Sequence, residues 1–133
     1  SAIGRSDYAA EITSRLFEAA LGLATRSLPE LFCGFEREPN LGPAPYPVAC
    51  QPQAWSAASV FLMMQAVLGM EVMGFDRRLL MRAPTLPPGM DWLKVEHLRL
   101  GDSTVSFVAH RGPRGAAIEI LEKTGKATVE VHK

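Results

Sequence analysis

The sequence predicts an α+β fold in which two helices are followed by a small antiparallel β-sheet. The first half carries two segments with helical apolar patterns, and the second half carries short β-like runs separated by turn residues. The chain has 133 residues, of which 47% are hydrophobic and 21% charged, as in a single globular domain. We place the boundary between a helical part, residues 1–74, and a β extension, residues 75–133.

The first helix is expected to run from Asp7, a suitable N-cap, to about Thr25. It must end before Pro29, because proline disfavours helical backbone at the preceding Leu28. Its apolar residues recur at steps of three or four and predict one buried stripe. The stripe consists of Tyr8, Ile12, Leu16, Ala19, Ala20 and Leu23.

The second helix is expected to start near Pro52 or Gln53 and to run to about Leu68, with Gly69 ending it. Proline suits the first helical turn, where its missing N–H is not needed. Almost every later position is apolar, and such a helix is normally buried on all sides. One neighbouring helix cannot cover it. We therefore expect the isolated chain to self-associate through this helix as a two-fold dimer.

Short β-like runs follow a linker that contains Pro84, Pro87, Pro88 and Gly89. Turn residues separate the runs, and apolar and polar residues alternate within them, which predicts an antiparallel meander with one buried face. The four runs are Trp92–Leu100, Thr104–His110, Ala116–Leu121 and Thr128–His132.

Charge and composition exclude several classes of function. Lys and Arg total 14 and so do Asp and Glu, without the basic stripe that a nucleic-acid surface needs. The longest apolar run, Val60–Met64, is far too short to span a membrane. No secretory signal is present, so we expect a cytoplasmic protein with reduced Cys33 and Cys50. No phosphate loop, serine nucleophile motif or metal motif occurs, so no metal or other cofactor is expected.

A long irregular segment between Leu31 and Cys50 holds two glycines and four prolines. Loops of this length are uncommon in compact domains, and they are usually functional or disordered. The aromatic residues Phe32, Phe35 and Tyr46 favour an ordered loop. Chemistry is therefore expected at this loop and at its two ends.

Three residues at the ends of this loop are candidates for a sugar-binding or catalytic site. Glu30 could act as a general base that takes a proton from water, although a surface glutamate is the simpler interpretation. Gln53 could bind sugar hydroxyls, and Trp55 could stack on a pyranose ring. A buried tryptophan that belongs to the core is the alternative for Trp55.

Two stretches, "LPELFCGF" and "PYPVACQPQAWSAAS", together resemble the C-terminal end of the amylo-α-1,6-glucosidase domain of glycogen-debranching-type enzymes. The shared pattern is Pro29-Glu30, a variable loop, Cys50 and then Gln53-Ala54-Trp55-Ser56. The segment "LPPGMDWLKVEHLRLGD" is similar to the short β tail of bacterial members. The resemblance implies an (α/α)6 toroid, of which the two helices here would be the last.

The resemblance also implies roles for individual residues. Glu30 corresponds to the general base, and the loop would direct Phe32, Phe35 or Tyr46 towards an α-glucan or oligosaccharide substrate. A partner acid, an Asp on an earlier loop of the toroid, is required as well. No acidic residue before Glu30 occupies that position.

We therefore expect a fragment that is inactive alone and whose partner is the N-terminal remainder of a parent glycosidase. One alternative is a small non-enzymatic α+β interaction module. Another is an enzyme of the same fold that acts on a different sugar.

Overall fold

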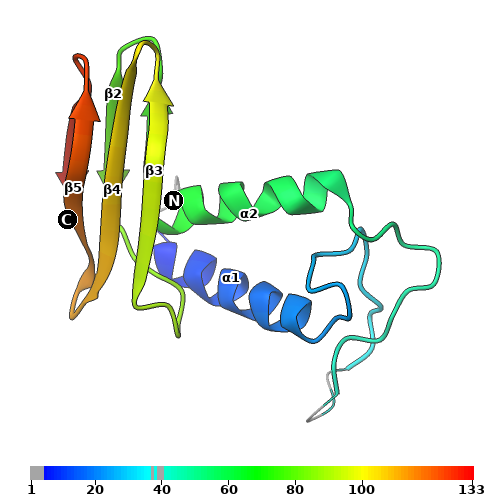
Figure 1. The fold of residues 1–133 in the computed structure, drawn as a ribbon. Helices are drawn as coiled ribbons and strands as arrows, with labels where there is room; N and C mark the ends of the chain where they lie inside the picture. Colours follow the sequence, from blue (N-terminus) through cyan, green and yellow to red (C-terminus); the bar gives the residue numbers. More distant parts are fainter. Residues whose placement is uncertain (1–4, 37, 39–40) are drawn as a thin grey trace.

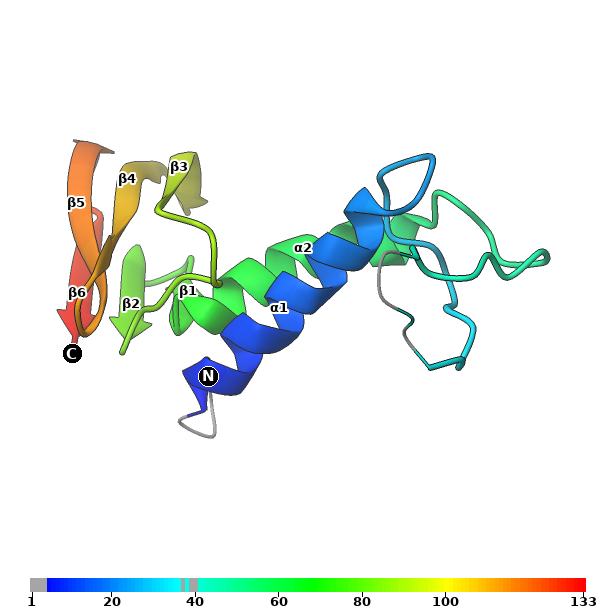
Figure 2. The same cartoon turned by 90° about the horizontal axis from the view of Figure 1, so that it is seen from below.

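The computed structural model describes residues 5–36, 38 and 41–133. The two helices lie side by side and extend away from the strands, and the described part of the loop between them lies at their far end (Figure 1, Figure 2). An α+β architecture is therefore confirmed. In chain order the elements are α1 (Ser6–Leu21), α2 (Ala54–Val67), β1 (Met70–Met73), β2 (Arg78–Arg82), β3 (Trp92–Leu100), β4 (Ser103–Gly112), β5 (Gly115–Thr124) and β6 (Thr128–His132).

The strands form two three-stranded sheets instead of the single antiparallel sheet expected. One sheet is antiparallel with the order β3-β4-β5, and the other has the order β1-β2-β6. Strand β2 pairs antiparallel with β1 but parallel with β6. The four expected strands all form. However, the last of them leaves the meander and joins a hairpin, β1-β2, that the sequence pattern did not predict.

The apolar core lies where the two sheets face each other and where the end of α2 reaches them (Figure 2). The predicted burial of Val105, Phe107 and Ala109 in β4 is confirmed, since all three are fully buried. The prediction of a single buried face is wrong for this strand, because Ser106 and Val108 between them are buried as well. From the opposite sheet, β2 contributes Leu79 and Met81. These contacts join strands that are distant in the sequence into one packed unit.

Helix α1 differs from the expectation at both ends and on its surface. Its N-cap is Arg5, which makes no side-chain cap, while Asp7 lies in the first turn and pairs with Arg5 at 2.9 Å. The helix ends at Leu21, before the expected Thr25. The predicted buried stripe is also wrong at two positions, because Tyr8 and Ile12 are exposed. Ala20 of the predicted stripe is buried, and the small residues Ala10 and Thr13, which were not predicted, are buried as well.

Helix α2 begins after Pro52. The expectation that this proline lies in the first helical turn is therefore wrong. Gln53 is the N-cap, and its side-chain oxygen accepts a hydrogen bond from the Ala54 N–H at 3.0 Å. The helix ends at Val67 with Leu68 as its C-cap, and the predicted Gly69 follows with a φ of +55°, which favours glycine. A Cβ atom at this position would lie only 2.0 Å from the carbonyl oxygen of Arg82. The turn into β1 therefore requires glycine.

Candidate functional site

The two ends of the long loop are joined by a pair of hydrogen bonds between Glu30 and Cys50. The Glu30 N–H donates to the Cys50 carbonyl at 3.0 Å, and the Cys50 N–H donates to Glu30 Oε2 at 3.2 Å. The preceding residue, Pro29, is buried, and its carbonyl accepts a hydrogen bond from Ser56 Oγ at 2.9 Å. These contacts, which we call the Glu30–Cys50 closure, position the glutamate at the start of α2.

A third side chain strengthens the closure. Gln51 Nε2 donates to Thr25 Oγ1 at 2.6 Å and to the Ser27 carbonyl at 3.3 Å. The segment after α1 is thereby attached to the segment that leads into α2. The loop ends are consequently fixed by hydrogen bonds, as a site at this place requires.

Of the five candidate residues, Glu30 belongs to this closure, and Gln53 and Trp55 lie in the stretch between Cys50 and Ser56 at the start of α2. The side chain of Glu30 is half-buried, and Gln53 caps α2 with its side-chain oxygen. Trp55 is 68% exposed, so the alternative interpretation as a core residue is wrong. Its ring is accessible to a ligand or to another protein.

Phe35 and Tyr46 lie elsewhere on the loop, and both are exposed. Phe35 lines an open hollow of about 870 Å³ beside the end of α1, together with Glu18, Glu36 and Glu38. Glu30, Gln53, Trp55 and Tyr46 do not line this hollow. The structure thus brings together the candidates next to α2 but does not gather all five around one cavity.

The chemistry available at the closure is that of one positioned carboxylate. A carboxylate has two oxygens with several acceptor sites, so Glu30 can accept the Cys50 N–H and still take a proton from water. A glycosidase needs a second carboxyl group, about 6.5–9.5 Å away in the inverting geometry. None of the neighbouring pattern residues, Pro29, Cys50, Gln53, Trp55 and Ser56, carries one. In a glycosidase that used Glu30 as its base, the acid would have to come from outside this group of residues.

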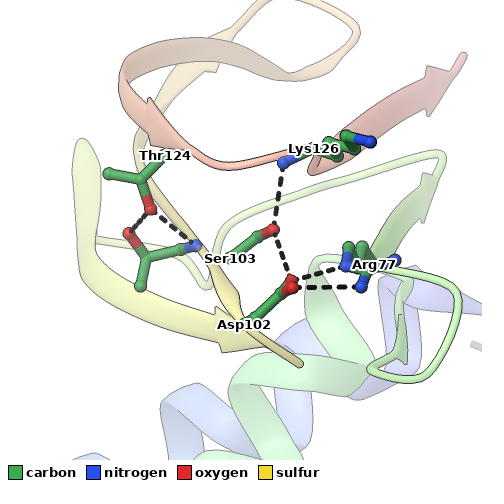
Figure 3. Close-up of polar contacts among 6 residues, drawn as sticks. Arg77, Asp102, Ser103, Thr124 and Lys126 are labelled. Carbon is green, nitrogen blue, oxygen red and sulfur yellow. Dashed lines mark hydrogen bonds and ion pairs between the residues drawn. The ribbon is translucent and has the colours of Figure 1, made fainter.

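A polar cluster that the sequence did not reveal joins three turns at one end of the sheets (Figure 3). Arg77 contacts the Asp102 carboxylate, which also accepts a hydrogen bond from Ser103 Oγ at 3.1 Å. The fully buried Ser103 hydroxyl accepts the N–H of Lys126 at 3.1 Å. Hydrogen bonds from Arg77 and then Ser103 lower the pKa of Asp102 to about 2. Because its members contact one another, we assign this cluster a structural role.

Arg111 is another polar residue whose position could not be read from the sequence. Its guanidinium group donates to the carbonyls of Leu86, Pro87 and Met90, with Nη2 to Met90 at 2.7 Å and to Leu86 at 3.5 Å. Arg111 therefore fixes the proline-rich linker that leads into β3. No sequence pattern indicated which arginines would bind such turns and linkers.

Comparisons with models of protein families, with curated proteins and with solved structures found no match. Within the described ranges, no three His, Cys, Asp or Glu side chains gather as metal ligands would. Neither helix seen in the described part of the chain has the length and hydropathy needed to cross a membrane. The function is therefore inferred from the site and from the sequence pattern.

Proposed function

We propose that this chain is the C-terminal part of a glycoside hydrolase of the amylo-α-1,6-glucosidase type, with Glu30 as the general base. The observation that carries the proposal is the Glu30–Cys50 closure. Glu30 is 20 positions from Cys50 and Pro29 is 27 positions from Ser56, yet a hydrogen bond joins each of these pairs. These residues belong to the sequence pattern on which the family resemblance rests. In the closure they act together to hold the Glu30 carboxylate in place.

In this proposal Glu30 removes a proton from a water molecule, which then attacks the anomeric carbon of the sugar. The bond to the leaving oxygen breaks on the opposite face, and that oxygen receives a proton from the second carboxyl group. The closure holds the base in place before substrate arrives, which lowers the cost of orientation in the transition state. The second carboxyl group would belong to the part of the enzyme that precedes this chain.

The residues around Glu30 favour a carbohydrate substrate. The exposed Trp55 ring offers a flat apolar surface for a pyranose, and the amide of Gln53 lies two positions before it in the chain. Phe35 and Tyr46 offer further exposed rings on the loop. We propose an α-glucan or an α-linked oligosaccharide, as the resemblance implies. Rings and amides alone would also suit a different sugar.

The surface of α2 also supports the idea that the chain works as part of something larger. Helix α2 has no charged residue, and its apolar side chains Phe61 and Leu62 are nevertheless largely exposed to solvent. In the proposed enzyme, preceding helices would cover them. The same exposure favours the alternative function, a non-enzymatic module that binds another protein through α2.

The test is an activity assay on the product of the complete natural reading frame, with release of glucose from a limit dextrin or an isomaltose-type substrate. Glu30→Gln should lower kcat by about 10²–10⁴-fold, the usual contribution of a general base. The matched control is Glu36→Gln, an exposed loop carboxylate, which should leave kcat within a few-fold of the wild type. Activity of Glu30→Gln within about tenfold of the wild type would reject the proposed role.

A further inference from the structure

One side of helix α2 is both exposed and apolar. We call it the α2 outer face and define it by Ala54, Trp55, Ala58, Phe61 and Leu62. Trp55 is 68% exposed, Phe61 78% and Leu62 67%. The opposite side of the helix is at least half-buried. That side holds Ser56, Ser59, Val60, Met63 and Val67.

The α2 outer face has the composition of the centre of an interface. Helix α2 contains no charged residue over its whole length, 54–67. The exposed side of α1 differs, because Asp7, Glu11 and Arg15 accompany its exposed Tyr8 and Ile12. Depletion of charge together with large aromatic side chains distinguishes interface centres from ordinary surface. The α2 outer face is therefore the stronger candidate for a protein contact.

The total accessible surface area of the chain also favours a protein contact. Its accessible area is 8996 Å², whereas a folded monomer of 14.5 kDa exposes about 6,900 Å². The chain thus exposes about 2,100 Å² more than its mass predicts. Obligate dimers bury about 2,000–5,000 Å² in total, half of it from each copy. The excess is distributed over the whole chain, including the long loop, and the largely exposed Trp55, Phe61 and Leu62 of the α2 outer face contribute to it.

We propose that two copies of this chain associate through the α2 outer face around a two-fold axis. A two-fold interface places one surface against itself, so the surface must be self-complementary. A charged face would meet like charges, but the uncharged α2 outer face does not, and the chain has a formal net charge of zero.

This inference does not depend on the proposed glycosidase function. It concerns the 133-residue chain by itself, in whose described residues Trp55, Phe61 and Leu62 are left largely exposed. Loss of hydrolysis in Glu30→Gln tests the function, whereas the mass of the isolated chain tests the association. Either can fail without the other.

The experiment is sedimentation equilibrium of the purified chain over about 1–100 μM. The wild type should be a dimer, and Phe61→Lys or Leu62→Lys should weaken association by about 30-fold or more, as loss of an interface hot spot does. Both positions are exposed, so the variants should keep the wild-type circular dichroism. Ile12→Lys and Phe75→Lys are matched controls at exposed apolar positions on α1 and on the β1–β2 turn. They should leave the dimer intact.

Tryptophan fluorescence gives an independent measure. In a Trp92→Phe background only Trp55 remains, and its emission should shift to shorter wavelength as the concentration rises through the dimer range. A wild-type monomer at 100 μM, an open-ended assembly, or a dimer disrupted by the control variants but not by Phe61→Lys and Leu62→Lys would each overturn the proposal.

Discussion

Arg77 and Asp102 form a two-point ion pair between the turns of two different sheets. Arg77 Nε lies 2.5 Å from Asp102 Oδ1, and Arg77 Nη2 lies 3.0 Å from Oδ2. Arg77 belongs to the turn between β1 and β2, whereas Asp102 lies in the turn between β3 and β4. Through Ser103 and Lys126 the contact extends to the turn between β5 and β6. One polar cluster therefore fixes the sheets at this end (Figure 3).

We predict that Asp102 makes the stability of the protein depend on pH in the acid range. Hydrogen bonds from Arg77 and then Ser103 lower the pKa of Asp102 from 3.8 to about 2 in the folded state. The ionised carboxylate therefore favours folding at pH values above 3.8. As the pH falls from 3.8 towards 2, the unfolded state binds the proton first and this contribution is lost. Asp102→Asn should be less stable than the wild type at neutral pH, with a smaller loss of stability over this window.

The measurement is urea unfolding of both proteins between neutral pH and about pH 2. Neighbouring basic groups also lower the pKa values of Asp7, Glu96 and Glu130, so the informative quantity is the difference between wild type and variant. Asp76→Asn, a change in the same turn as Arg77, is the control and should follow the wild-type profile. Parallel profiles for the wild type and Asp102→Asn would contradict the prediction.

Ser103→Ala should destabilise the protein by about 1–3 kcal/mol, because it leaves the Lys126 N–H without the acceptor that it has in the folded state. Ser103 is fully buried, so water cannot easily replace the hydroxyl. Thr104→Ala is the matched control. It removes the exposed contact between Thr104 and Thr124 and should cost less than about 1 kcal/mol. Equal losses in the two variants would show that the Ser103 hydroxyl has no special role.

Local patterns predicted the isolated elements well and their partners poorly. The limits of β3 and β6 match the runs Trp92–Leu100 and Thr128–His132, because alternation and turn residues are local properties. The hairpin β1-β2 was missed since Leu79, Leu80 and Met81 are consecutive buried residues without alternation. Parallel pairing of β6 with β2 depends on contacts between positions 50 residues apart, for example Arg78 with Thr128. No local pattern encodes such a contact.

At the candidate site, too, the residue types could be predicted from the sequence but their contacts could not. Residue type and resemblance indicated Glu30, but the hydrogen bonds that fix it come from Cys50, across a 20-residue loop. The apolar pattern of α1 predicted a buried Ile12, which is exposed because α1 places its small residues inward. The position of a helix about its own axis is determined by its packing partners, which sequence periodicity does not identify.

Arg111→Lys should loosen the linker that precedes β3. The arginine donates several hydrogen bonds to the carbonyls of Leu86, Pro87 and Met90, whereas the single ammonium group of lysine cannot reproduce this planar arrangement. We expect a loss of about 1–3 kcal/mol in unfolding free energy and faster amide hydrogen exchange at Met90, whose N–H bonds to Pro87. Arg114→Lys, at the β4–β5 turn, is the control. Unchanged exchange at Met90 would argue against this role for Arg111.

The last prediction separates the position of Glu30 from its basicity. Glu30 Oε2 accepts the Cys50 N–H at 3.2 Å. Glutamine retains an oxygen acceptor, whereas alanine removes it. Glu30→Gln should therefore keep the hydrogen exchange of the Cys50 amide close to wild type, and Glu30→Ala should accelerate it about fivefold, as loss of one net hydrogen bond implies. Glu36→Ala, elsewhere on the loop, should have no effect. If Cys50 exchanges equally in wild type and Glu30→Ala, the side chain does not fix the closure. If Glu30→Gln keeps Cys50 protected, a loss of hydrolysis in that variant reflects the missing base and not a displaced loop.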